Sequence, residues 1–275
     1  MPLLDYRIDG KPPTTLIFPP VVSKMSTIIH GKPGPSGLLG RLLEQGIVLT
    51  AEWEELNADT RDYLLRLDYP EPLLSQLLRY HLVTPFQSDA IQRGLSSELT
   101  IGQYRILSQL GQGGMGTVYR AEHMYLRRQV AVKVMTRSVG SNPRLLHRFY
   151  AEAHAVAKLH HSSIVTCFDA GRQTIPGSNS RDYFVMELVP GSDLAEFVRV
   201  RGPLSPGKAC DLFRQLAEAL VEAHRHRLVH RDIKPSNVQI TPDWNAKLLD
   251  FGLALQPNQR MTEPGTLLGT IGYMA

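Results

Sequence analysis

The feature of this sequence that most constrains its fold is a glycine-rich run between two segments with the pattern of β-strands. The run Gly-Gln-Gly-Gly-Met-Gly extends from Gly111 to Gly116, and the strand-like segments are Tyr104–Leu110 and Thr117–His123. A Gly-x-Gly-x-x-Gly run that binds a dinucleotide opens a helix, whereas Val118 and its neighbours continue as a strand. The run therefore predicts a glycine hairpin whose backbone N–H groups can approach phosphates, since no Cβ blocks them.

The following segments predict an α+β domain of two lobes. We expect a third strand at Gln129–Thr136 and then a helix that begins at the capping pair Asn142-Pro143. Two further strands are expected at Ile164–Ala170 and Tyr183–Glu187, and a long helix is expected to start at Ser205-Pro206. The domain is placed at residues 104–275, with a β-rich first lobe at 104–189 and a helical second lobe at 190–275.

The N-terminal region has a different character. Residues 1–40 are rich in Pro and Gly and predict a disordered arm. Residues 41–97 predict a small helical module. Its four helices are expected to begin after a capping Thr50, to span Thr60–Leu67, to follow Pro70, and to extend from Pro85 to Gly94.

The helical module also contains a faint internal repeat. Leu42-Leu43 and Thr50 are matched, with a one-residue gap, by Leu77-Leu78 and Thr84. Two interpretations of the module stay open, a docking or regulatory unit and a packed spacer.

Two further motifs supply charges suited to phosphates. In Val130-Ala131-Val132-Lys133, Ala131 and Lys133 share one face of a strand, which puts a small side chain beside an ammonium group. A long lysine needs an anion to hold its position, and Glu152 on the following helix can supply one. Glu152 alone would be read as a solvated helix residue; beside the other motifs the functional interpretation is favoured.

The most specific motif is His230-Arg231-Asp232-Ile233-Lys234-Pro235-Ser236-Asn237, with Asp250-Phe251-Gly252 following Asp232 by 18 residues. In this order, the four motifs resemble those of eukaryotic-type serine/threonine protein kinases of bacteria. The resemblance covers residues 104–275, and the acidic helical module resembles the N-terminal extensions of some bacterial kinases of this type.

The resemblance implies ATP and Mg2+ as cofactors and a role for each motif. Asp232 would accept the proton of the substrate hydroxyl, Lys234 would meet the γ-phosphate, and Lys133 would pair with Glu152 and hold the α/β-phosphates. Asn237 and Asp250 would hold the metal. The phosphates would be covered by Leu110, Gly111, Gln112, Gly113, Gly114, Met115 and Gly116. Adenine would be enclosed by Val118, Ala131 and Gln239 and by the hinge residues Met186, Glu187 and Val189.

The resemblance also implies the substrate class. Lys234 stands where serine/threonine kinases carry lysine, and Thr270 agrees with a protein substrate modified on Ser or Thr. Arg231 beside the proposed base marks a class that is often switched by phosphorylation, for which Thr262 and Thr266 are the candidate sites.

The sequence departs from the family pattern in two places. Gln239 stands where an aliphatic side chain commonly supports adenine, and a buried amide without a partner costs roughly 1–3 kcal/mol. The chain ends at Ala275, where Pro-Glu normally follows, so we expect an incomplete second lobe and phosphate transfer at least about 100-fold slower than in an extended chain. The alternative function is an ATP-binding pseudokinase-like or interaction fragment.

Composition limits the other classes. Residues 1–100 hold 9 Lys and Arg against 12 Asp and Glu, whereas residues 101–275 hold 21 against 14. The basic second part would suit a nucleic-acid binder, but no recognition motif accompanies it, so no nucleic-acid partner is expected. No membrane segment is predicted, although a longer parent would allow a membrane anchor. Only Cys167 and Cys210 are present, which favours a reducing, cytoplasmic location.

Overall fold

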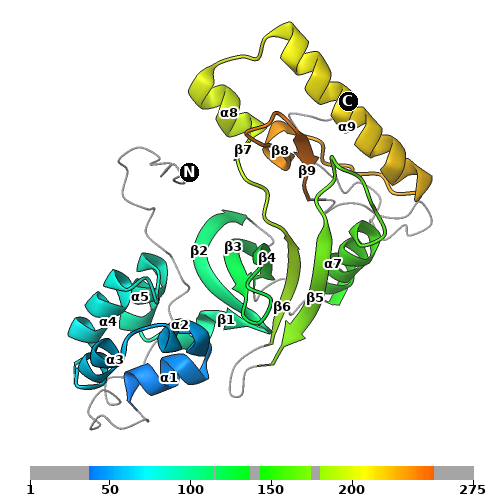
Figure 1. Ribbon diagram of the computed structural model, residues 1–275. Coiled ribbons are helices and arrows are strands. Elements are labelled where there is room, and N and C mark those ends of the chain that lie inside the picture. Colours follow the sequence, from blue (N-terminus) through cyan, green and yellow to red (C-terminus); the bar gives the residue numbers. More distant parts are fainter. Residues whose placement is uncertain (1–36, 68, 114–115, 137–142, 175–179, 251–275) are drawn as a thin grey trace. The chain divides into compact units, whose positions relative to one another are not determined.

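The structure, a computed structural model, describes residues 37–67, 69–113, 116–136, 143–174 and 180–250 (Figure 1). The predicted arm falls almost wholly outside the described residues, as do Thr262, Thr266 and Thr270. No helix in these ranges is long and apolar enough to cross a membrane.

Five helices and a short 3-10 turn form the N-terminal module. They are α1 Leu38–Glu44, α2 Thr50–Glu54, α3 Ala58–Leu65, α4 Pro70–Arg79, α5 Pro85–Gln92 and the 3-10 turn Ser96–Glu98. Hydrophobic residues from all parts of the module share one core, among them the fully buried Leu42 and Leu77. The module therefore buries its own hydrophobic side chains.

The internal repeat corresponds to a repeated turn. After α1, Gly46 takes a left-handed conformation with φ 67°, and Ile47 N donates to Leu42 O at 2.9 Å. After α4, His81 has φ 58° and Leu82 N donates to Leu77 O at 2.9 Å. Both turns close a helix by bonding one of its last carbonyls and direct an aliphatic side chain into the core.

The starts of α1 and α2 differ from expectation, whereas α5 begins at Pro85 as expected. Helix α1 begins at Leu38, inside the segment predicted to be a disordered arm, because its leucines are buried in the module core. Thr50 is the first residue of α2, not its cap, which is Leu49. Helix α5 carries a capping box that the sequence analysis missed, in which Thr84 and Gln87 each bond the other's backbone N–H.

The first lobe is a six-stranded antiparallel sheet in the order β1-β2-β3-β4-β6-β5 (Figure 1). The strands are β1 Thr100–Ile101, β2 Tyr104–Gly113, β3 Gly116–His123, β4 Gln129–Met135, β5 Cys167–Gln173 and β6 Arg181–Glu187. Strand β5 begins three residues later than predicted, because Ile164 forms a bridge with Leu248 of the second lobe instead.

Both faces of this sheet are covered. On one face Ala131 and Phe184 pack with Phe149 and Ala153 of helix α7, Pro143–Val156. On the other face Val130, Val132 and Val185 form a separate cluster, against which Phe86 of α5 packs. The alternation along β4 thus places Lys133 on the same face as Ala131.

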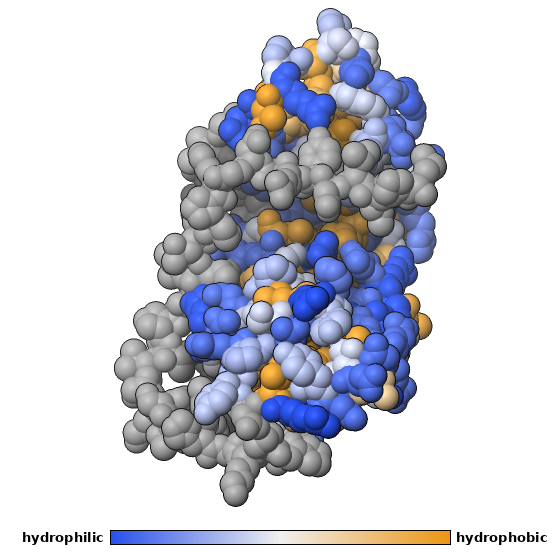
Figure 2. Space-filling view, turned by 60° about the vertical axis from the view of Figure 1, so that its left-hand side comes forward, coloured by the Kyte–Doolittle hydropathy of each residue, from blue (hydrophilic) through white to orange (hydrophobic). Residues whose placement is uncertain are grey.

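The second lobe contains two helices and a three-stranded sheet β7-β8-β9. Its elements are β7 Ser192–Asp193, α8 Leu194–Arg201, α9 Pro206–Arg225, the 3-10 turn Pro235–Asn237, β8 Val238–Ile240 and β9 Ala246–Leu248. Helix α9 buries Leu212 and Leu216 against this sheet. Phe213 of the same helix is exposed. Hydrophobic residues lie scattered over the mainly hydrophilic face in Figure 2.

A buried charge cluster connects the module to β2. Arg105 of β2 bonds both carboxylate oxygens of Glu52 in α2, at 2.7 and 2.5 Å, and its Nε donates to Glu122 of β3 at 2.7 Å. Arg127 contacts the same two carboxylates. Burial alone would raise the pKa of Glu52, but Arg105 and Arg127 outweigh it and lower that pKa below its ordinary 4.5. Glu52 therefore adds stability above about pH 4.5, and this contribution is lost as the pH falls further.

We expect Arg105→Met to lower the free energy of unfolding by about 3 kcal/mol, because it leaves two buried carboxylates short of their partner. Urea denaturation at pH 7 measures the change. The control is Arg93→Met, whose pair with Asp89 is exposed and should cost less than about 1 kcal/mol. Equal losses in the two variants would contradict the importance of the buried cluster.

Candidate active site

Buried His230 organises the loop that carries the predicted base. Its Nδ1 accepts a hydrogen bond from Asp232 N at 3.3 Å, and its Nε2 lies 2.9 Å from Leu249 O. Since Nδ1 accepts, the ring proton belongs on Nε2, which donates to the carbonyl. Burial lowers the pKa of His230, which favours this neutral form. The ring thus joins the loop of Asp232 to the residue that precedes Asp250.

The carboxylate of Asp232 lies between a cation and an amide. Lys234 Nζ is 2.8 Å from Asp232 Oδ2, and Asn237 Nδ2 donates to the same oxygen at 3.1 Å and to Asp232 O at 2.8 Å. The structure therefore brings the predicted catalytic Asp232 and Lys234 together with the predicted metal ligand Asn237. Local spacing explains this, because the three lie within one short loop that ends in a 3-10 turn.

The second predicted metal ligand, Asp250, meets Lys133. Lys133 Nζ lies 2.5 Å from Asp250 Oδ1, and the lysine side chain is 11% exposed against 43% for the aspartate. The side chain of Glu152, the predicted partner of Lys133, falls outside the described part of α7. Leu249 N donates to Asn237 O at 2.8 Å, which ties the two predicted metal-bearing segments together.

Two residues of the site have unusual backbone conformations. Arg231 has φ 65° and Asp250 has φ 50°. Side chains other than glycine reach this left-handed region at a cost of roughly 1–2 kcal/mol, and such residues cluster at functional sites. Each stands at or beside a predicted catalytic or metal-binding aspartate.

The glycines of the hairpin divide into two kinds. A Cβ on Gly116 would lie 2.2 Å from Val134 O, so close packing of β3 on β4 requires glycine there. A Cβ on Gly111 or Gly113 would meet no atom within 4 Å. The space over these two glycines is thus open to a ligand, as a phosphate-covering hairpin requires. Leu110 is exposed, Gln112 pairs with Thr117, and Gly114 and Met115 lie outside the described residues.

The predicted adenine-binding residues come from both lobes. Val118, Ala131, Met186 and Val189 belong to one hydrophobic cluster together with Leu249. Gln239 lies on β8, half-buried, opposite Lys247 of β9. The structure therefore gathers the apolar members of the set in one cluster, whereas Gln239 lies on a strand of the second lobe.

Glu187 has a role that the sequence analysis missed. Its backbone N donates to Thr166 O at 2.9 Å, and its side chain accepts from Thr166 N at 3.3 Å and from Lys247 Nζ at 2.8 Å. The side chain thus links the two lobes through Lys247. Lys247 lies three residues before Asp250. No local sequence pattern predicts that it pairs with Glu187, which is 60 positions away.

The site fits Mg2+ in its chemistry. Mg2+ is usually held by one or two carboxylates together with substrate phosphates and waters, not by a cage of protein ligands. Asp250 and Asn237 offer such oxygens, and the described ranges contain no group of three or more His, Cys, Asp and Glu side chains arranged to hold a metal.

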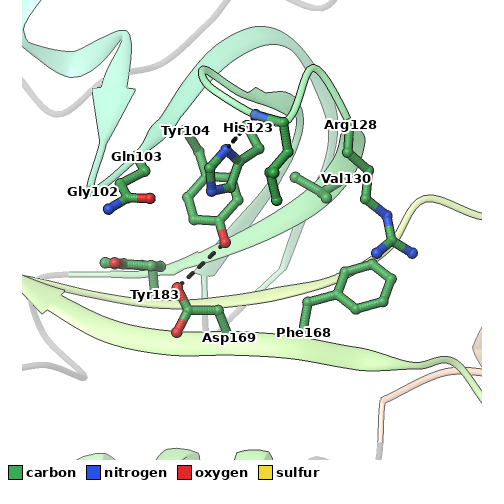
Figure 3. Close-up of a pocket in the computed structure, with 10 residues that line it drawn as sticks. Gly102, Gln103, Tyr104, His123, Arg128, Val130, Phe168, Asp169 and Tyr183 are labelled. Atoms are coloured by element: carbon green, nitrogen blue, oxygen red, sulfur yellow. Dashed lines mark hydrogen bonds between the residues drawn. The ribbon is translucent and has the colours of Figure 1, made fainter.

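A separate cavity of about 580 Å³ lies on the outer part of the first lobe (Figure 3). Tyr104 and Tyr183 line it, Tyr104 donates to Asp169 at 3.3 Å, and Arg128 stacks on Phe168. Burial and the charge of Asp169 raise the pKa of Tyr104 to about 12. None of the residues predicted to bind nucleotide or metal lines this cavity.

Comparison with known proteins identifies the family of this chain. The family described as the protein kinase domain matches residues 104–275. The serine/threonine-protein kinase PknA of Mycobacterium tuberculosis is 40% identical over 175 residues, which cover 63% of this chain and 41% of the relative. PrkC of Bacillus subtilis is 36% identical over 63% of this chain and 26% of its own length. PknL of Mycobacterium tuberculosis is 37% identical over 66% of this chain and 44% of its own length. The chain thus spans less than half the length of these curated relatives.

We expect His230→Phe to lower the free energy of unfolding by about 2 kcal/mol, because the main-chain groups of Asp232 and Leu249 lose a buried partner. The pKa of His230 is lowered by folding, so its contribution is present above the ordinary pKa of 6.5 and is lost as the pH falls below it. Denaturation of both proteins between pH 8 and pH 5 should therefore show a weaker pH dependence in the variant.

The matched control is His161→Phe. His161 Nδ1 also accepts a bond from the N–H two residues later, that of Ser163, at 3.1 Å. If His161→Phe lowered the free energy of unfolding as much as His230→Phe, the hydrogen bond from the N–H two residues later would explain the whole effect, and the bond from His230 to Leu249 O would contribute nothing.

Proposed function

Because this chain belongs to the protein kinase family, we propose that it transfers the γ-phosphate of ATP to serine and threonine hydroxyls of proteins. The observation that carries the proposal is the arrangement around Asp232, whose carboxylate is held by Lys234 and Asn237 beside a second, lysine-paired carboxylate at Asp250. Phosphoryl transfer asks mainly for positioning and charge compensation. This chain offers residues for both from three separate segments, namely the loop of Asp232, the segment of Asp250 and the strand of Lys133.

Asp232 acts as the base in this proposal. The substrate hydroxyl gives its proton to the Asp232 carboxylate as its oxygen attacks the γ-phosphorus, and the bond from that phosphorus to the bridging oxygen of ADP breaks. Asn237 orients the carboxylate through the 3.1 Å bond to Oδ2. Lys234, 2.8 Å from the same oxygen, is near enough to neutralise charge on the transferred phosphoryl group.

Lys133 and the glycine hairpin hold the nucleotide phosphates. With ATP bound, Lys133 contacts the α/β-phosphates and is kept in place by Glu152, while Gly111, Gly113 and their neighbours cover them. Asp250 and Asn237 would hold Mg2+, which would supply positive charge to the phosphates of the nucleotide. The side chains of Lys133 and Asp250 are in contact in this structure, so the ammonium group and the proposed metal-binding carboxylate lie at the same place in the site.

Adenine lies against the cluster of Val118, Ala131 and Met186 in this proposal. The backbone of Glu187 and Val189 binds its edge, with the Glu187 carbonyl as acceptor, since Glu187 N already donates to Thr166 O. Gln239 closes the other face and makes affinity modest. We propose specificity for serine and threonine because Lys234 stands where serine/threonine kinases carry lysine.

Three further features of the proposal concern the setting of the reaction. Protein substrates follow from the relatives' names. A cytoplasmic location is supported by the low cysteine content, which is limited to Cys167 and Cys210. A partner that docks on the helical module would act on the nucleotide site through the attachment of that module to β2.

We expect Mg-ATP at ten times its Kd to raise the Tm of this chain by about 3–5 °C, since a ligand that binds the native state stabilises it. Thermal denaturation is followed with ATP in the presence of Mg2+ or of EDTA. Asp250→Asn should remove most of the metal-dependent part, and Lys133→Met should remove most of the shift.

Phosphate transfer is assayed with labelled ATP on serine, threonine and tyrosine peptides. Asp232→Asn should slow transfer by about 10²–10⁴-fold while leaving the Mg-ATP shift in place. Nucleotide binding without any Asp232-dependent transfer would favour the pseudokinase-like alternative. Absence of any shift with Mg-ATP would reject the nucleotide site itself.

A further inference from the structure

Three consecutive residues of β2 are held by the helical module. Arg105 bonds Glu52 of α2 and also donates to Ile47 O at 3.3 Å. Ile106 O accepts from Gln87 Nε2 at 2.8 Å, and Ile106 N donates to Leu99 O at 2.7 Å. Leu107 O accepts from Thr84 Oγ1 at 2.6 Å. The helical module is therefore bonded directly to β2 at three successive residues and is not merely connected to it through the chain.

The attachment point is a β-bulge. Ile106 is opposite Ala121 and Ser108 is opposite Arg120, so Leu107 is the extra residue of β2. A bulge interrupts the ladder locally, and buried main-chain groups there need other partners. The side chains of Thr84 and Gln87 provide them for two successive carbonyls, those of Ile106 and Leu107.

The capping box of α5 uses each side chain twice. Thr84 Oγ1 accepts from Gln87 N at 3.2 Å and donates its hydrogen to Leu107 O. Gln87 Oε1 accepts from Thr84 N at 2.8 Å, and its amide N–H is donated to Ile106 O. Gln87 is only 1% exposed. The oxygens therefore close the helix start, while the O–H and N–H groups hold the bulge.

We propose that Thr84 and Gln87 are positioning residues for nucleotide binding, which clamp the bulge of β2 and thereby fix the glycine hairpin that the same strand enters. The role in nucleotide binding rests on the proposed function. Gly111 follows Leu107 by four residues, and beyond a second extra residue at Leu110 the pairing with β3 continues to Gly113 opposite Gly116. Because the bulge is held by Thr84 and Gln87, the strand that forms one arm of the glycine hairpin is fixed a few residues before the hairpin begins.

The chain offers variants that separate the clamp from the helix cap. Gln87→Glu, studied at pH 8 where the carboxylate is ionised, keeps the acceptor of the capping box but loses the donor to Ile106 O. Thr84→Ala loses the donor to Leu107 O together with the cap of α5, and Thr84→Ser restores both. Asn57→Ala is the matched control, because Asn57 caps α3 at 2.7 Å from Thr60 N in the same module and its described bond does not involve β2.

The first measurement is amide hydrogen exchange of the whole chain without nucleotide. We expect Gln87→Glu and Thr84→Ala to speed exchange over Ser108–Gly113 by about 5–10-fold, as the loss of a buried hydrogen bond implies. Thr84→Ser and Asn57→Ala should leave that segment unchanged. Exchange that changes only within the module, or equally in Asn57→Ala, would overturn the proposal. Circular dichroism identifies a variant that has unfolded, in which case Thr84→Ala against Thr84→Ser decides.

The second measurement is the Kd for Mg-ATP by titration. We expect a rise of about 3–10-fold in Gln87→Glu and Thr84→Ala and none in the two controls. If exchange over the hairpin increases but the Kd does not, the clamp is structural and its positioning role is rejected. If the unmodified chain does not bind Mg-ATP, the proposed function fails, while the exchange measurement still tests the clamp.

Discussion

The site depends on one buried connection between two loops of the second lobe. His230 bonds the backbone on both sides, at Asp232 N and Leu249 O, and Leu249 N is bonded to Asn237 O. These bonds hold the segment of the proposed base against the segment that ends in Asp250. Each carboxylate then has its own lysine, Lys234 in one case and Lys133 in the other, so neither aspartate is left as an isolated partly buried charge.

The first lobe follows from a different constraint, the need to keep a glycine-rich hairpin in register. Glycine gives β2 and β3 room to approach β4 and a ligand, but it supplies no side chains that would anchor the strand ends. Strand β2 is instead held near its start, where the helical module bonds Arg105, Ile106 and Leu107. The module is packed at this bulge through the contacts of Thr84 and Gln87, and the regulatory interpretation stays a prediction.

The sequence predicted well what depends on short spacing. Asp232, Lys234 and Asn237 lie in one loop, so their meeting required only that the loop be compact. Contacts between distant segments were missed, as the Glu187–Lys247 pair illustrates, because a single charged residue carries no sign of its partner. Helix α8 was missed although Asp193 caps it, since none of its residues is buried and Val198 and Val200 are exposed, which leaves a weak apolar pattern. The start of β5 was placed too early because Ile164 has strand character but pairs in the other lobe.

The capping box shows where local rules stop and what physical chemistry adds. Thr-x-x-Gln before an apolar run predicts a helix start from the sequence alone, and the two oxygens satisfy that prediction completely. Each side chain still carries a donor that the cap does not use. For the buried Gln87 an unused N–H would be costly, so a main-chain acceptor has to lie within reach. An unbroken sheet offers few such acceptors, because its carbonyls are bonded in the ladder, whereas a bulged strand exposes them. The donors that the cap of α5 leaves unused are met in this chain by a bulge, and that bulge lies in the strand that leads to the glycine hairpin.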